Sequence, residues 1–317
     1  MTRKLHASGW ARVLVTAVVL ALLLRTISLS QAMETIARLR VDAALAVLAL
    51  LALDRMVMIW RWVILLRARG QRIAVKSAVW IYLVSSFVGS FLPAGVGGDL
   101  ARAYTLYERT AQGSAAAASV AVDRLLGLLS IVAVGLIGVA IGGTARVPPT
   151  VIAAAAAVIA LGTAALLWSD RWIRFATPRA WSGTSTGSRV LRLADALSAY
   201  RGHRAALTAV ALLSVGVQLL RILQAYLLGL GIGIRVPFSY YLFFMPIGLI
   251  ALMLPISVSG FGAPQGLIVW LLKPVGVPDA EAFALSTLIV LSGILANLPG
   301  ALLYLRRGRS EIAPHPM

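Results

Sequence analysis

The chain has 317 residues, of which 60% are apolar and 13% are charged, and its formal net charge is +18. A soluble globular chain carries about a quarter charged residues and cannot bury this much apolar surface. The absence of cysteine excludes disulfides and thiolate metal sites. Its Arg residues lie at the ends of apolar runs, which is typical of membrane proteins rather than of nucleic-acid binding. We therefore expect a multi-pass protein of a bacterial inner or plasma membrane, with no nucleic-acid partner.

Six apolar runs are each long enough to cross a hydrocarbon core about 30 Å thick as a helix. They cover roughly residues 10–30, 41–66, 114–141, 151–168, 205–230 and 282–305. Two further apolar limbs, 78–92 and 237–254, end in tips rich in glycine, proline and serine. A basic loop over 67–76 and a polar connection over 169–204 separate neighbouring runs.

The positions of the basic segments predict the topology. The N-terminus, the 67–76 loop, the 169–204 connection and the residues after 305 are all basic, so all should face the cytoplasm. They can do so only if each limb with a broken tip returns to the side from which it came. We predict an all-α polytopic membrane protein with six transmembrane helices and two re-entrant hairpins, over 77–113 and 237–274. Both termini are then cytoplasmic.

The two tips form an internal repeat. Leu92-Pro93-Ala-Gly95-Val96-Gly97-Gly98 aligns with Leu254-Pro255-Ile-Ser257-Val258-Ser259-Gly260 at an offset of 162 residues. We predict a single membrane domain over 1–317 with two inverted repeats, 1–142 and 150–309. Inverted repeats with broken helices at matching positions are typical of secondary transporters, whose site lies near the membrane midplane. Either tip alone would also fit an ordinary loop, since Pro and Gly are common in membrane helices.

Charged residues within the apolar runs indicate function, because burying them in a membrane is costly. They are Asp54, Arg55, Arg61, Asp99, Arg102, Asp123, Arg124 and Arg221. Arg exceeds acid in this set, so we expect a cavity that prefers an anion such as a phosphate head group. Arg102 and Arg124 are the residues we expect to bind it, with Asp99 holding Arg102. An alternative is that neighbouring pairs, Asp99 with Arg102 and Asp54 with Arg55, only fasten helices together.

The first tip is similar to a pattern, P-G-x-x-G-G-D-x-x-R followed by V-x-x-D/E-R, of flippase-like membrane proteins related to the transmembrane region of lysylphosphatidylglycerol synthase. The matching residues are Pro93, Gly97, Gly98, Asp99, Arg102, Val120, Asp123 and Arg124. Arg61-Trp62 before Leu65-Leu66 resembles the family's R-W-x-x-L-L element. Two positions depart from the pattern. Ala94 replaces a usual Gly, and Pro264-Gln265 stands where the second half usually has a Glu, which argues against proton or cation coupling there.

This resemblance covers essentially the whole chain and implies movement of polar-headed lipids between leaflets. The cargo would be a phospholipid, an aminoacyl-phospholipid such as aminoacylated phosphatidylglycerol, or a polyprenyl-phosphate-linked carrier. The expected binding residues are Arg61, Pro93, Gly97, Gly98, Asp99, Arg102, Asp123, Arg124, Arg221, Pro255, Ser257, Ser259, Gly260 and Gln265. We expect no cofactor and no metal. Some relatives carry a soluble aminoacyl-transferase domain, but only a short segment follows Leu305, so we expect no lipid synthesis and no enzyme activity.

Two other functions fit the sequence. A membrane-embedded transferase using a polyprenyl-linked donor would need a carboxylate pair, for which Asp99 and Asp123 are the plausible residues. An accessory subunit that anchors an envelope enzyme would need no site at all. A nucleotide-driven pump is excluded, because the sequence contains no P-loop pattern.

Overall fold

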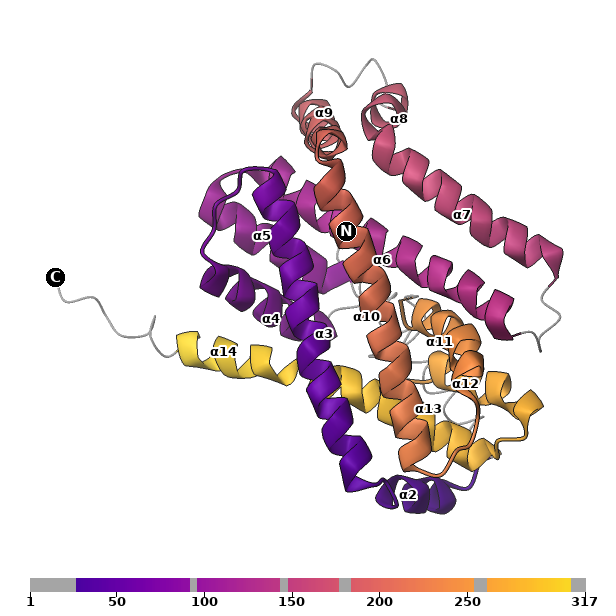
Figure 1. Cartoon of the computed structure of the whole chain (residues 1–317). Coiled ribbons are helices and arrows are strands. Elements are labelled where there is room, and N and C mark those ends of the chain that lie inside the picture. The colour runs from indigo at the N-terminus through magenta and orange to yellow at the C-terminus, as the bar shows by residue number, and fades with distance from the viewer. Residues whose placement is uncertain (1–26, 92–95, 143–147, 177–183, 254–260, 309–317) are drawn as a thin grey trace, which may run out of the picture.

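The computed structural model describes residues 27–91, 96–142, 148–176, 184–253 and 261–308, which form helices and the turns between them (Figure 1). Within these described ranges, five helical segments are long and apolar enough to cross a membrane: Val41–Ala68, Gly113–Ile141, Pro149–Leu167, Arg204–Gly231 and Asp279–Arg306. They correspond to five of the six predicted spans. The predicted first span lies largely outside the described residues, so the count of six stays a prediction. The all-helical, polytopic architecture is confirmed.

Helices α3 (Val41–Ala68) and α10 (Arg204–Gly231) lie side by side along the molecule (Figure 1). α3 is continuous because its sequence contains neither Gly nor Pro. The helix ends at Ala68, and Gly70 turns the chain with a φ of +67°, a conformation that glycine adopts without strain. The amide of Gln71 then donates to the carbonyl of Leu66 at 3.0 Å. The most extensive helix–helix contact among the described residues is therefore made by two long apolar helices.

The first broken limb is a helical hairpin of α4 (Val75–Phe91) and α5 (Val96–Thr110), whose tip, 92–95, lies outside the described residues. The limbs approach closely at Gly89 and Gly98. A Cβ on Gly89 would lie 2.6 Å from the Cα of Gly98, so only glycine fits there. Leu66 before the hairpin and Ala116 after it share one buried cluster with Ala78. The hairpin thus begins and ends at the same end of the molecule.

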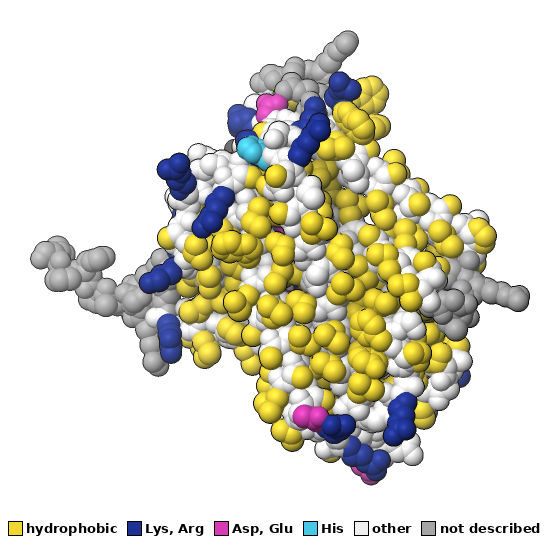
Figure 2. All heavy atoms as spheres, viewed as in Figure 1, with side chains coloured by type: hydrophobic (Ala, Val, Ile, Leu, Met, Phe, Trp, Pro, Cys, Tyr) yellow, Lys and Arg dark blue, Asp and Glu magenta, His cyan; other side chains and the backbone are white. Residues whose placement is uncertain are grey.

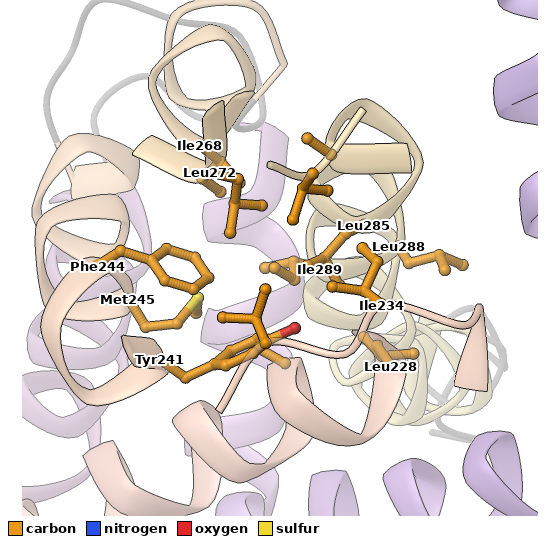
Figure 3. Close-up of a cluster of buried hydrophobic side chains, with 14 of the residues drawn as sticks. Leu228, Ile234, Tyr241, Phe244, Met245, Ile268, Leu272, Leu285, Leu288 and Ile289 are labelled. Atoms are coloured by element: carbon orange, nitrogen blue, oxygen red, sulfur yellow. The ribbon is translucent and has the colours of Figure 1, made fainter. Parts of the chain in front are cut away.

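The second broken limb repeats this arrangement at the opposite end, with α11 (Phe238–Met253) and α12 (Ala263–Leu272). Its tip, 254–260, is likewise outside the described residues. Figure 3 shows Tyr241, Phe244 and Met245 of α11 facing Ile268 of α12 and Leu285 of the next helix in one apolar cluster. The 3₁₀ turn η4 (Lys273–Val275) then leads to α13 (Asp279–Leu295).

The last span differs from the continuous helix predicted over 282–305. Ala296 and Asn297 form a turn between α13 and α14 (Leu298–Gly308). Pro299 explains the break, because it lacks the amide hydrogen that a continuous helix would need there and its ring crowds the preceding turn. The break turns Asn297 toward α4, where its amide nitrogen donates to Ser90 Oγ at 2.8 Å.

The two hairpins exchange partners between the halves of the chain. α4 packs against α14, and α11 packs against α6 (Gly113–Gly142). Both contacts depend on a glycine, because a Cβ on Gly138 of α6 would overlap the carbonyl of Leu242, and one on Gly300 of α14 would overlap that of Leu83. Gly138 and Gly300 are separated by 162 residues, the offset of the two tips.

The remaining elements lie at the two ends and on the outside. α7 (Pro149–Leu167) packs on α6, and its other faces carry exposed apolar side chains. The polar connection forms α8 (Ser169–Ala176), α9 (Ser185–Ser198) and the 3₁₀ turn η3 (Ala199–Gly202), where the hydroxyl of Tyr200 donates to the carbonyl of Leu65. α2 (Leu29–Ala37) covers α13 at the opposite end. Figure 2 shows hydrophobic side chains over the middle of one face and Lys and Arg around its margin, as lipid contact requires.

Candidate functional site

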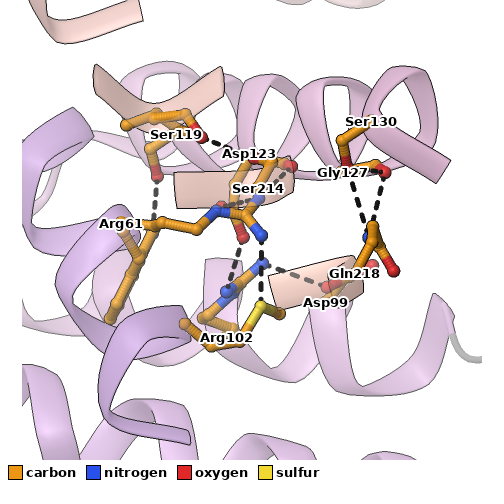
Figure 4. Close-up of polar contacts among 12 residues, drawn as sticks. Arg61, Asp99, Arg102, Ser119, Asp123, Gly127, Ser130, Ser214 and Gln218 are labelled. Carbon is orange, nitrogen blue, oxygen red and sulfur yellow. Dashed lines mark hydrogen bonds and ion pairs between the residues drawn. The ribbon is translucent and has the colours of Figure 1, made fainter. Parts of the chain in front are cut away.

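A chain of four ion pairs joins α3, α5 and α6 in the interior, and Figure 4 shows the pairs of Arg61 and Arg102 with Asp123 and Asp99. Asp123 accepts from Arg61 Nη2 at 2.9 Å through one oxygen and from Arg102 Nη1 at 3.2 Å through the other. Asp99 accepts from Arg102 Nη2 at 3.1 Å and from Arg124 Nη1 at 2.9 Å. Every oxygen of both carboxylates is therefore held by a guanidinium.

Local structure explains how these side chains meet. Asp99 lies in the first turn of α5, where the helix dipole favours an acid, and Arg102 follows one turn later. The guanidinium of Arg102 lies 5.2 Å from the ring centre of Trp62 and 5.0 Å from that of Tyr82. Such faces stabilise a cation that is removed from water. Arg102 is thus enclosed by two rings and two carboxylates.

A second charged group joins α3 to α10. Asp54 accepts from Arg221 Nε at 3.0 Å, and its other oxygen lies 3.4 Å from Nε of the adjacent Arg55. The pairing of Asp54 with Arg55, which the sequence offered as an alternative to a binding role, is present, and Arg221 adds a partner from the other half of the chain. Asp54 is buried, so its carboxylate is shielded from water.

Both groups border a cavity of about 550 Å³ between the two halves of the chain. Five Arg residues line it: Arg55, Arg61, Arg102, Arg124 and Arg221. Asp99 and Asp123 line it as well, and Asp54 lies in the wall of an adjoining cavity of about 210 Å³. Five guanidiniums against three carboxylates leave a formal excess of two positive charges around the two cavities.

The adjoining cavity is mostly apolar. Its wall includes Leu51, Leu228, Met245, Leu249 and Ile289, and it shares Arg55 and Arg221 with the larger cavity. The two Arg side chains therefore stand at the junction of a charged space and an apolar one. An amphiphile with a charged head and an apolar chain matches this division.

The structure brings together seven of the residues predicted to bind the ligand. Arg61, Gly98, Asp99, Arg102, Asp123, Arg124 and Arg221 all line the larger cavity. Gly97 lies beside them in the first turn of α5. Five of the predicted residues lie outside the described ranges: Pro93, Pro255, Ser257, Ser259 and Gly260.

Gln265 lies apart from both of these cavities. Its side-chain oxygen accepts from the amide of Gly262 at 3.1 Å, and its nitrogen donates to Thr287 Oγ1 of α13 at 2.9 Å. Both polar ends of the buried side chain are used to close the start of α12 and tie it to α13. This geometry fits a structural role better than ligand binding.

The Arg side chains differ in how much they offer a ligand. The side chains of Arg61 and Arg102 are 2% and 5% exposed, whereas that of Arg124 is 31% exposed. Both terminal nitrogens of Arg102 are taken by Asp123 and Asp99, so the expectation that it keeps them free for an anion does not fit this geometry. Among the described residues, Arg124 contacts a carboxylate through Nη1 alone, and its remaining donors are left for a ligand.

Sequence reasoning missed several polar residues of the cavity wall, namely Tyr82, Ser85, Ser86, Ser90 and Asn297. One signal was present for the last of them. Asn297-Leu298-Pro299-Gly300 is a third polar and Pro/Gly interruption of an apolar run, like the two tips. The serines of α4 carry no such signal, since Ser is common in membrane helices.

The comparisons with known proteins agree with this picture of a membrane domain. The family model described as Lysylphosphatidylglycerol synthase TM region matches residues 9–300. Among proteins with curated descriptions, none matches this chain.

Proposed function

Because the chain belongs to the family of the lysylphosphatidylglycerol synthase transmembrane region, we propose that it moves an anionic, polar-headed lipid between the leaflets of a bacterial inner membrane. The observation that carries the proposal is the cavity with a formal excess of two positive charges inside a helical membrane domain. Charges at membrane depth are costly and are kept where they contact a ligand or each other. The excess of positive charge is the part that these ion pairs leave unexplained.

The hairpins support a re-entrant topology. α4 and α11 have 17 and 16 residues, fewer than the ~20 that a helix needs to cross a hydrocarbon core. Each leads into a limb that returns to its starting end. In this proposal both tips lie at membrane depth, where broken backbone is tolerated only beside protein or a water-filled cavity.

Helix boundaries support the inverted repeat. Shifted by 162 residues, α3 would span 203–230 and α4 would span 237–253, and the structure has α10 at Arg204–Gly231 and α11 at Phe238–Met253. The exchanged contacts, α4 with α14 and α11 with α6, are those that a two-fold relation between halves requires. Such a relation offers two equivalent arrangements, which is how many transporters expose one site to either side.

The distribution of surface charge supports cytoplasmic termini. Where α3 ends and α6 begins, including α8 and α9, the described basic residues are Arg67, Arg69, Arg72, Lys76, Arg109, Arg171, Arg192, Arg201 and Arg204, against two described acids, Glu108 and Asp195. At the opposite end, the four acids Glu34, Asp42, Asp279 and Glu281 balance the four bases Arg38, Arg40, Arg235 and Lys273. The basic end therefore faces the cytoplasm by the positive-inside rule.

Labelling of single cysteines tests this topology directly, because the natural chain has none. We expect Glu108→Cys at the end of α5 and Arg192→Cys on α9 to react with a membrane-impermeant thiol reagent only from the cytoplasm. Val275→Cys beyond α12 is expected to react only from the outside. Reaction of Glu108→Cys from the outside would mean that residues 75–110 cross the membrane, and the hairpin model would be wrong.

The transferase remains the second candidate, and the geometry favours it less. All four oxygens of Asp99 and Asp123 accept from guanidiniums, so neither carboxylate is free to hold a metal or to act as a base. A transport site needs no such free carboxylate.

Leaflet exchange in vesicles tests the proposed function. Purified protein reconstituted with fluorescent anionic phospholipid in one leaflet is expected to speed equilibration between leaflets above that of protein-free vesicles, with no new lipid product by mass spectrometry. Equal rates with and without protein would refute lipid transport. A new glycolipid formed from a polyprenyl-linked donor would favour the transferase instead.

A further inference from the structure

Three guanidiniums of the cavity are held by one nitrogen each. Arg55 and Arg221 contact Asp54 through Nε, and Arg124 contacts Asp99 through Nη1. Within the described ranges, the terminal nitrogens of Arg55 and Arg221 make no hydrogen bond or ion pair. Anchoring through one nitrogen fixes the position of a guanidinium and leaves its planar donor edge for a second anion.

The excess charge selects the anion. A ligand with two negative charges would neutralise the surplus left by the three carboxylates, a singly charged head group would leave one positive charge, and a zwitterion would leave both. A head group with a net positive charge, such as a lysylated phosphatidylglycerol, would add a like charge to the cavity. Repulsion between like charges makes this last ligand the least favoured.

The position of the apolar cavity says what the anion is attached to. It begins at Arg55 and Arg221 and continues between Leu51, Leu249 and Ile289. A charge held by these two Arg side chains therefore lies beside a mostly apolar wall, which suits an apolar chain attached to the charge. A phosphate at the end of an apolar chain has this shape.

We propose, building on the lipid transport proposed above, that the preferred cargo is a lipid phosphate monoester. Arg55, Arg124 and Arg221 bind its phosphate, and the adjoining cavity takes its apolar chain. A phosphate monoester carries about −1.5 to −2 charges at neutral pH, because its second pKa is about 6. Phosphodiester head groups carry one charge and fit less well. Arg61 and Arg102, enclosed by their partners, position Asp123 and Asp99 rather than the ligand.

The test compares head groups in vesicles of neutral phosphatidylcholine, with each fluorescent probe added at trace level. The probes are phosphatidic acid, a polyprenyl phosphate, phosphatidylglycerol, lysyl-phosphatidylglycerol and phosphatidylcholine. We expect the two monoesters to move at least about tenfold faster than phosphatidylglycerol, the ratio that one further charge-assisted hydrogen bond supplies. The faster of the two monoesters tells whether the chain is acyl or isoprenoid.

Two outcomes overturn the inference. If lysyl-phosphatidylglycerol or phosphatidylcholine moves as fast as the monoesters, the excess charge does not select the cargo, although lipid transport stands. If no probe moves faster than in protein-free vesicles, the proposed function fails, and this inference fails with it.

Variants assign the preference to the three Arg residues. Arg55→Gln and Arg221→Gln each remove one of the surplus charges, so the rate ratio of phosphatidic acid to phosphatidylglycerol is expected to fall about tenfold. A ratio of two probes is insensitive to a misfolded fraction, which slows both equally. Arg67→Gln, twelve residues after Arg55 on the exposed end of α3, removes the same charge outside the cavity and should keep the wild-type ratio. An unchanged ratio in Arg55→Gln and Arg221→Gln would contradict their assignment as phosphate ligands.

Discussion

Replacing Asp123 by Asn is expected to lower stability by about 3–5 kcal/mol, because it removes the single charge that two buried guanidiniums share. Arg61 and Arg102 would keep their charges at 2% and 5% side-chain exposure, with one carboxylate, Asp99, left for Arg102 and none for Arg61. Asn has nearly the same shape as Asp and keeps one acceptor oxygen, so the loss of stability measures the effect of removing the negative charge. The measurement is the melting temperature of the purified protein in detergent, followed by size-exclusion chromatography with fluorescence detection.

The control for this variant is Asp42→Asn. Asp42 pairs with Arg40 at the exposed start of α3, where both side chains are more than half exposed. Exposed ion pairs contribute little, so its melting temperature should equal that of the wild type. If Asp123→Asn has the same melting temperature as Asp42→Asn, the ion-pair chain does not hold α3, α5 and α6 together, and the site as described is wrong.

Adding a single methyl group at Gly138 or Gly300 is expected to cost about 1–3 kcal/mol or more, the range for overpacking a closely fitted interior. At both positions a Cβ would overlap a backbone carbonyl of the facing hairpin, that of Leu242 or Leu83, which cannot rotate away as a side chain would. Gly138→Ala and Gly300→Ala should therefore each lower the melting temperature and separate a hairpin from its partner helix.

Gly216→Ala is the matched control for both. Gly216 lies inside α10, and a Cβ there meets no atom within 4 Å among those of the described chain. Since Ala favours helix over Gly by up to about 1 kcal/mol, this variant should be as stable as the wild type or more so. Equal stability of all three Ala variants would show that the exchanged hairpin contacts are looser than the structure describes.

The long helices could be predicted from the sequence because apolar length alone decides them in a membrane. The predicted 41–66 and 205–230 differ by at most two residues from α3 at Val41–Ala68 and α10 at Arg204–Gly231. The break at Asn297 was missed because the surrounding run is apolar enough to read as continuous. The interruption there is decided by Pro299 and by contacts with α4, and only the first of these is visible locally.

The charged set of the site could be predicted as well, but its pairing could not. Burial of charge in apolar runs marks Asp54, Asp123 and Arg221 whatever their partners. The pairs that the sequence suggested were close in the chain, whereas Asp123 with Arg61 and Asp54 with Arg221 are 62 and 167 residues apart. No local pattern indicates such contacts, because they depend on how α3, α6 and α10 cross. For the same reason, the sequence could not predict that Asp123 occupies a terminal nitrogen of Arg102.

The most direct test of the account is the rate of leaflet exchange of an anionic lipid by Arg124→Gln, measured beside Arg67→Gln and the wild type in reconstituted vesicles. Arg124 is the most exposed guanidinium of the ion-pair chain and still has donors to offer, whereas Arg67 lies at the exposed end of α3 beyond the cavity. We expect Arg124→Gln to slow exchange about tenfold or more, the effect of losing a charge-assisted contact to a phosphate. Arg67→Gln should match the wild type. If Arg124→Gln folds, inserts and exchanges lipid at the wild-type rate, the cavity does not bind the head group and its charges only fasten the helices.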